Sequence, residues 1–207
     1  MKKVNENQNG KKISKEEAIA IFSRIRENKD KMILWEERHG ILPEIPFNFN
    51  FLTFAAFCGN HIVVQSMDVL NESWESELDG MNALHLATLN DKVEIVKYLL
   101  KHIKDRDINA TCDGKLTALH IACRESSNSC LKLLLENEKI KINLKSDGGF
   151  TPLHFACFNS NLEAVKLLID KGADKNITDL KGRRPIDLIK DRNDEISNKI
   201  KELLTSR

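Results

Sequence analysis

The 207-residue chain carries 32 lysine and arginine residues against 31 aspartate and glutamate residues, which leaves a formal net charge of +1. With 41% hydrophobic and 30% charged residues, its composition is typical of a folded globular protein and excludes a disordered chain. The balanced charge gives no reason to expect nucleic acid or an anionic membrane as the main partner, and no stretch approaches the roughly 20 apolar residues that span a bilayer.

The first ten residues are basic and polar, with no apolar run behind them, so they do not have the pattern of a secretory signal. The five cysteines show no spacing typical of a zinc or redox pair. They are Cys58, Cys112, Cys123, Cys130 and Cys157. A reducing compartment is the simplest interpretation, and we expect the cytoplasm, with the nucleus as a second compartment to consider.

The N-terminal segment is predicted to differ from the rest of the chain. Residues 1–12 are predicted to be disordered. Ser14 and Glu17 form a capping-box pattern that opens a helix with an apolar stripe, so residues 13–46 are expected to be a helical N-terminal extension. Two interpretations of this extension stay open: it caps the following domain, or it docks a partner.

From residue 47 to residue 204 one motif recurs with a period near 33 residues. Its equivalent positions are Leu52, Leu84, Leu119, Leu153 and Ile186, separated by 32, 35, 34 and 33 residues. Such a period indicates a solenoid built from stacked structural repeats. The repeat boundaries are predicted near 47–78, 79–112, 113–146, 147–178 and 179–204.

Each unit is predicted to consist of a turn, two short helices and a loop. Asp147 and Gly148 provide a tight turn, and Pro152 suits the first turn of a helix. Apolar residues recur at every third or fourth position over Leu162–Ile169, as they do on one face of a helix. Gly172 then ends that helix.

These motifs resemble the ankyrin repeat. Residues 147–156 read Asp-Gly-Gly-Phe-Thr-Pro-Leu-His-Phe-Ala, and Leu-Glu-Ala-Val-Lys-Leu-Leu at 162–168 and Gly-Ala-Asp-Lys-Asn at 172–176 follow in register. The resemblance implies an all-α fold, an ankyrin-repeat solenoid of antiparallel helix pairs with β-hairpin-like turns. Lys115 departs from the pattern, since it stands where glycine is usual, and the loop 101–109 is lengthened.

Histidine recurs at one position of the repeat, as His85, His120 and His154. The resemblance implies that these side chains join adjacent repeats by hydrogen bonds. The remaining histidines have no catalytic motif around them, and the glycines lie in turns rather than in phosphate-binding loops. We therefore expect no enzymatic activity, no cofactor and no metal.

In the ankyrin family, partners usually meet the hairpin tips and the exposed side of the first helix of each repeat. Carried over by register, the candidate partner-binding residues are Phe57, Met81, Leu89, Leu116, Arg124, Phe150, Phe158, Lys181 and Arg183. Six of them are apolar and could form a contiguous patch, which usually marks an interaction site. The alternative is that some of these side chains, Phe150 in particular, pack against neighbouring residues.

The C-terminal repeat has two further features. Basic residues gather around the last hairpin, either as a solvated capping face or as a docking site for an acidic partner segment. They are Lys171, Lys175, Lys181, Arg183 and Arg184. A final helix over 195–204 is expected to hold Ile196, Ile200, Leu203 and Leu204 on one face and so cap the stack.

The function expected from this resemblance is that of a non-catalytic scaffold or adaptor, monomeric on its own, that binds a protein partner and neither nucleic acid nor membrane. Two narrower roles are alternatives. One is a regulator similar to the inhibitor-of-kappa-B proteins, which masks a transcription factor. The other is a microbial effector that binds a host protein.

Overall fold

The computed structural model describes residues 80–102, 108–189 and 194–205, the backbone of 5–6 and 12–13, and the single positions Ala56, Gly59, His61 and Val64. Strand β1 (Asn5–Glu6) pairs antiparallel with β2 (Lys12–Ile13), at the edges of the segment for which the sequence predicts disorder. The rest of the predicted N-terminal extension lies outside the described residues. Its capping or docking role therefore stays a prediction.

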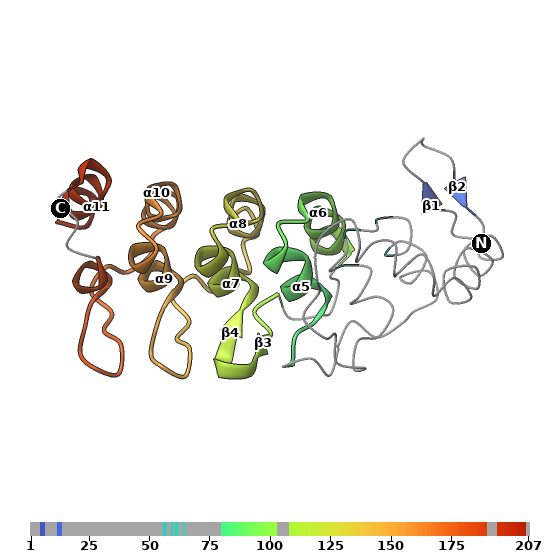
Figure 1. Ribbon diagram of the computed structural model, residues 1–207. Helices are drawn as coiled ribbons and strands as arrows, with labels where there is room; N and C mark the ends of the chain where they lie inside the picture. Colours follow the sequence, from blue (N-terminus) through green and yellow to red (C-terminus); the bar gives the residue numbers. More distant parts are fainter. Residues whose placement is uncertain are drawn as a thin grey trace, which may run out of the picture.

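Four successive units form two layers of helices, as Figure 1 shows. The first layer contains α5 (Ala83–Leu89), α7 (Ala118–Glu125), α9 (Pro152–Phe158) and the 3₁₀ helix η2 (Pro185–Leu188). The second contains α6 (Val93–His102), α8 (Asn128–Leu135), α10 (Leu162–Asp170) and α11 (Glu195–Thr205). The stack of antiparallel helix pairs confirms the predicted all-α solenoid.

The first helix of a repeat begins with a reciprocal capping arrangement. Thr117 precedes α7, and its side-chain oxygen accepts a hydrogen bond from the backbone N–H of His120, while the His120 ring accepts one from the backbone N–H of Thr117. The pairs Asn82 with His85 and Thr151 with His154 are arranged in the same way. Because helix starts leave backbone N–H groups without partners, this arrangement fixes where each first helix begins.

A hairpin precedes each of α7, α9 and η2 and projects away from the second layer (Figure 1). In the hairpin made by β3 (Thr111–Cys112), η1 (Asp113–Lys115) and β4 (Leu116–Thr117), Lys115 has a φ of 55°. Gly149 occupies the equivalent place in the next hairpin, with a φ of 77°. A side chain is disfavoured in this left-handed region, so Lys115 introduces local strain without preventing the turn.

Neighbouring hairpins are joined by backbone hydrogen bonds at equivalent positions. The N–H of Asp147 donates to the carbonyl of Gly114 over 2.8 Å, and the N–H of Leu180 donates to the carbonyl of Gly148 over 3.2 Å. These bonds keep the hairpins in register, so that their tips form one continuous edge of the stack.

One apolar core runs along the stack between the two layers. The repeated leucines Leu84, Leu119 and Leu153 are at most 2% exposed. Ala56 and Val64, from the first predicted repeat, belong to the same buried cluster. Burial of each such leucine contributes about 2 kcal/mol, and the shared core therefore makes each repeat depend on its neighbours.

The prediction for the last helix was wrong at one position. Ile196 is 49% exposed, whereas Ser197 is fully buried with Ile200 and Leu204. Positions 197, 200 and 204 are three and four residues apart, so they share the helix face that meets the stack. Ile196 lies beside that face and points to the surface.

Candidate functional site

The candidate site is the surface formed by the hairpin tips and the outward side of the first helices, which we call the recognition face. Directly beneath it lies a row of buried histidines. In His120, Nε2 lies 3.0 Å from the carbonyl oxygen of Leu144 and 3.1 Å from that of Phe150. Because carbonyls only accept hydrogen bonds, Nε2 carries the hydrogen and Nδ1 accepts from the backbone.

The other two repeated histidines make similar bonds: His154 reaches the following hairpin, and His85 bonds to the backbone just before the following hairpin and to Leu116 within it. Nε2 of His85 donates to the carbonyl of Ala110 over 3.0 Å, and Nε2 of His154 donates to the carbonyl of Arg183 over 3.1 Å. These bonds confirm the prediction that the histidines join adjacent repeats. The ring nitrogens are thereby occupied within the protein itself.

Burial holds these histidines in the neutral form. It lowers the pKa of His85 and of His120 from 6.5 to about 4, against the smaller opposite effect of the hydrogen bonds to backbone carbonyls. Burial also lowers the pKa of His154. A neutral imidazole with no exposed nitrogen is not placed to exchange a proton with a substrate, so the repeated histidines have a structural role.

The described cysteines are free thiols buried in the stack. Burial raises the pKa of Cys123 above its usual range and raises that of Cys157 to about 12. Since the thiolate is the reactive form, neither residue is suited to nucleophilic chemistry near neutral pH. Within the residues that the structure describes, no group of three or more His, Cys, Asp or Glu side chains could hold a metal ion.

The structure locates all but one of the predicted partner-binding residues. Half-buried are Met81, Leu89, Leu116, Arg124, Phe150 and Arg183, whereas Phe158 and Lys181 are exposed. The remaining residue, Phe57, lies outside the described part of the chain. Arg124 is engaged locally, because its Nε lies 2.6 Å from Oε1 of Glu125.

Phe150 is a packed aromatic residue as well as a surface one. Its ring meets the ring of His154 edge-on at 5.8 Å and lies 5.6 Å from the ring of Phe155. The guanidinium carbon of Arg183 lies 5.9 Å from the Phe150 ring centre. Gly148 makes room for this ring, because a Cβ there would lie 2.7 Å from ring carbons. The predicted alternative, in which Phe150 packs against its own hairpin, therefore has direct structural support.

Phe158 is placed differently. It is the last residue of α9 and is 49% exposed. The following residue, Asn159, donates from Nδ2 to the carbonyl of Arg124 over 2.6 Å, which ties the end of α9 to the end of α7. The backbone at this end of α9 is thus anchored to the neighbouring repeat, while the Phe158 side chain is presented at the surface.

Leu180 is a surface residue that the prediction did not include among the binding residues. It is 77% exposed at the tip of the last hairpin. The sequence does contain a signal for it, since the equivalent position is Asp113 in one earlier hairpin and Asp147 in the next. Leu180 is thus an apolar residue at an exposed position where the two preceding hairpins have an aspartate, and this difference marks it as a candidate contact residue.

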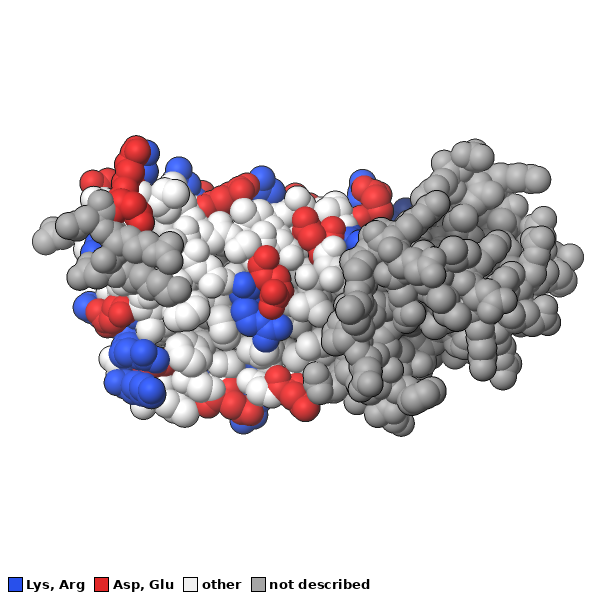
Figure 2. Space-filling model, viewed as in Figure 1, with Lys and Arg blue, Asp and Glu red and all other residues white. Residues whose placement is uncertain are grey.

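Figure 2 shows how charge is distributed over this side of the molecule. A largely uncharged band runs across the first helices, interrupted by one group of opposite charges near the centre. Acidic and basic side chains gather along the upper and lower margins. Such a band with a charged rim is the distribution found at protein–protein interfaces.

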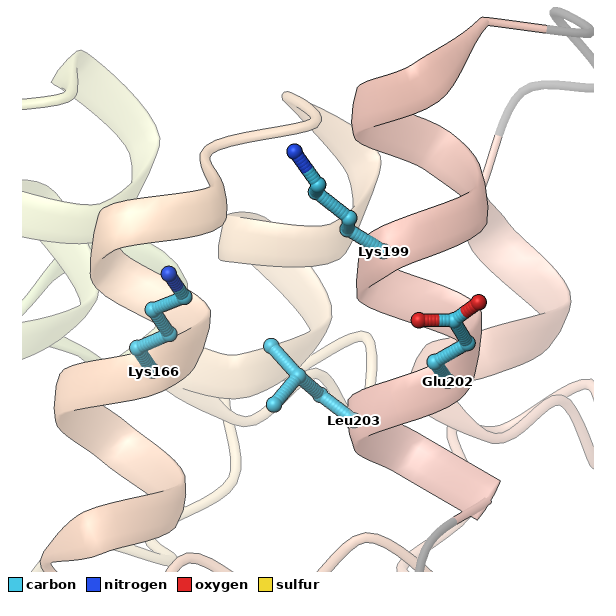
Figure 3. A pocket seen from close by; sticks show the side chains of 4 residues that line it. All are labelled: Lys166, Lys199, Glu202 and Leu203. Atoms are coloured by element: carbon cyan, nitrogen blue, oxygen red, sulfur yellow. The ribbon is translucent and has the colours of Figure 1, made fainter.

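A hollow of about 360 Å³ lies between α10 and α11 in the second layer. It is lined by Lys166 from α10 and by Lys199, Glu202 and Leu203 from α11 (Figure 3). Lys199 is already paired with Glu195, Nζ to Oε1, at 2.5 Å. Its surface is mostly aliphatic, from Leu203 and the stems of the charged side chains, and the charges at its margin are of both signs, so we do not assign it a ligand.

No helix in the described part of the chain is both long and apolar enough to cross a membrane.

Comparison with known proteins agrees with this geometry. A family model described as ankyrin repeats in three copies matches residues 31–146 and 103–179. Over 59 residues the chain is 44% identical to an ankyrin repeat protein of Acanthamoeba polyphaga mimivirus. That match covers 28% of this chain but only 8% of the viral protein.

Proposed function

Because the chain belongs to the ankyrin-repeat family, whose members are protein–protein interaction modules, we propose that it acts as a scaffold or adaptor that binds a protein partner through the recognition face. The family is generally non-catalytic, and the expected absence of catalysis is part of this proposal. The proposal concerns binding alone. Binding either holds the partner in place or blocks the partner from contacting another molecule.

The observation that carries the proposal is the contrast between the buried polar groups and the exposed aromatic group of this face. Beneath the surface, the ring nitrogens of His85, His120 and His154 are used by the protein's own backbone. At the surface, Phe158 presents an aromatic ring on an anchored helix end. Exposed aromatic residues on a rigid backbone are typical anchors of protein interfaces, because little entropy is lost when they are buried.

Two narrower roles would use the same face. A regulator that masks a transcription factor and a microbial effector that binds a host protein differ from an adaptor in the partner, not in the binding geometry. We propose the adaptor as the general case and the cytoplasm or nucleus as the compartment, where buried free thiols persist without oxidation. We also propose that the unbound chain is monomeric.

Site-specific photo-crosslinking tests the proposed function. A photoreactive amino acid replaces Phe158 in one variant and Lys132 in the other, because Lys132 lies on α8 in the second layer. After irradiation in cell extract, the variant at position 158 is expected to form a discrete adduct that unlabelled wild-type protein competes away. Adducts of equal yield at both positions, or none at position 158, would contradict the proposal.

A further inference from the structure

We propose that the last hairpin, residues 179–184, is the part of the recognition face that binds an acidic segment of the partner, and that this segment carries an apolar side chain next to its carboxylates. This inference rests on the proposed function and specifies the chemistry of the partner. Three features of the hairpin support it: its charge, its exposed leucine and the aromatic residue behind it.

The hairpins differ in charge along the stack. Residues 112–117 contain one acidic and one basic residue, and residues 146–151 contain one acidic residue and no basic one. Residues 179–184 contain one acidic and three basic residues. The formal charge of the hairpins therefore changes from zero to −1 and then to +2 at the C-terminal end.

The acidic residues of the earlier hairpins are partly neutralised between repeats. Nζ of Lys115 lies 3.1 Å from Oδ1 of Asp147, with both side chains largely exposed. At the equivalent position of the last hairpin the carboxylate is replaced by Leu180. The last hairpin thus lacks an acidic side chain at this position of its tip.

The single carboxylate of the last hairpin is used internally. Asp179 has a side chain only 1% exposed, and it accepts hydrogen bonds from the backbone N–H groups of Lys181 and Arg183 and from the guanidinium of Arg183. Burial raises its pKa, but these bonds outweigh burial, and the pKa lies below its usual range. Asp179 therefore fixes the turn and balances Arg183. Lys181 is left as an exposed cation at the tip, and no described residue forms an ion pair with it.

The apolar part of the surface is Leu180, which is 77% exposed beside Lys181. Behind it, Arg183 lies over the ring of Phe150 from the preceding repeat. An arginine held over an aromatic ring keeps donors available for a carboxylate, and the stacked pair is a preorganised surface. A ligand that complements this surface needs carboxylates for Lys181 and Arg183 and an apolar group for Leu180.

Figure 2 agrees with this assignment, because basic side chains gather at the lower end of the face, on the side of the last hairpin. Arg184 also belongs to this hairpin, but it is paired with Asp187 at 3.5 Å. The charge excess available to a partner is therefore concentrated on Lys181, because Asp179 balances Arg183. Opposite charge on the partner would steer its approach and fix its orientation on the hairpin.

Fluorescence anisotropy with short labelled peptides tests the inference on the full chain. The first peptide alternates glutamate with leucine, the second replaces its leucines by serine, and the third replaces its glutamates by lysine. The first is expected to bind most tightly, with an affinity that falls as salt is raised. No binding of the first peptide, or equal binding of the first and third, would overturn the inference.

The variants Lys181→Glu and Leu180→Ser locate the binding. Each is expected to weaken binding of the first peptide by about tenfold, through charge reversal and through loss of the apolar contact respectively. Lys166→Glu is the matched control, because it makes the same charge reversal on α10 in the second layer, and it is expected to change affinity by less than about twofold. An equal loss with Lys166→Glu would mean that net charge alone drives binding and would overturn the assignment to the hairpin.

Failure of this inference is distinguishable from failure of the proposed function. If the crosslink at position 158 captures a partner while the acidic peptide does not bind, the chain is a binding module whose last hairpin has another role. If neither experiment gives binding, both proposals are wrong.

Discussion

The buried row of histidines and the tips of the hairpins belong to the same repeats but differ in how much their residues vary from one repeat to the next. His85, His120 and His154 recur at one position and donate to backbone carbonyls in the next hairpin or directly before it. At the tips, two consecutive hairpins carry Asp113 and Asp147, whereas the last one carries Leu180. The positions that recur hold the stack together, and the positions that change give each repeat a different surface.

The difference has a physical origin. A buried imidazole must satisfy both ring nitrogens, so its position tolerates little change once the surrounding backbone is fixed. A tip side chain contacts mainly solvent, and substitutions there usually change stability by less than about 0.5 kcal/mol. Evidence for function should therefore come from the tips, and evidence for stability from the histidines.

Mild acid is expected to destabilise the stack more than any single substitution discussed here. Above pH 6.5 the histidines are neutral in both the folded and the unfolded chain. Between pH 6.5 and about 4 only the unfolded chain takes up protons, because burial lowers the folded pKa of His85 and His120 to about 4. The free energy of unfolding should fall by about 3 kcal/mol for each of these two residues.

Urea unfolding at pH 7.5, 6.0 and 5.0 measures the part of this loss that is complete by pH 5, about 2 kcal/mol for each residue. The lowered pKa values of Asp179 and Asp187 affect stability only at lower pH, below the usual range of a carboxyl group, so the interval from 6.5 to 5 reports on histidine. His120→Gln removes one titrating group and should give a shallower pH dependence. A variant with the wild-type slope would show that His120 does not titrate as described.

A single buried histidine is expected to contribute the next largest effect. His120→Ala removes the hydrogen bonds to the carbonyls of Leu144 and Phe150 and leaves a cavity, since the side chain is fully buried. We expect a loss of roughly 3 kcal/mol in the free energy of unfolding at pH 7.5. Equilibrium urea unfolding measures it.

The control for this variant is Lys132→Ala. Lys132 is half-exposed and pairs with Glu163 at 2.6 Å on the second layer, so its removal should cost less than about 0.5 kcal/mol. If His120→Ala costs no more than Lys132→Ala, the bonds of His120 do not hold the repeats together.

Much of the fold follows from the sequence because each structural device repeats. The Thr-Pro-Leu-His pattern at 151–154 predicts the helix start at Pro152, and Gly172 follows the end of α10 with a φ of 84°. The exposure of Ile196 does not follow from the sequence in the same way. In α11, Ser197 is small enough to face the stack, and apolar periodicity alone did not identify that Ser197 rather than Ile196 would be buried.

The candidate site was less predictable than the fold. Register correctly indicated that Phe158 is presented at the surface. The packing of Phe150 was one of the predicted alternatives, but its partners Phe155, His154 and Arg183 were not identified. Such contacts join residues of two repeats and depend on side-chain geometry, which a repeat pattern does not contain. The sequence did contain a signal that Leu180 is exposed. This signal is visible only when Leu180 is compared with the aspartates at the same position of the earlier hairpins.

The variants Phe150→Ala and Phe158→Ala are expected to change stability least. Comparing them separates a role in packing from a role in recognition. Phe150→Ala should lower the free energy of unfolding by about 1–2 kcal/mol, because the half-buried ring loses contacts with two aromatic neighbours. Phe158→Ala should lower it by less than about 0.5 kcal/mol, because about half of its surface is exposed. Thermal unfolding of the two variants beside wild type measures the difference.

Both variants should nevertheless weaken capture of the partner identified by crosslinking, each by at least about fivefold, because aromatic side chains dominate the energetics of protein interfaces. The informative result is a loss of binding by Phe158→Ala at unchanged stability, since an unfolded fraction then cannot account for it. If Phe158→Ala instead destabilises the chain as much as Phe150→Ala, the ring is part of the packing between repeats. The anchor of the recognition face would then have to be sought at the hairpin tips.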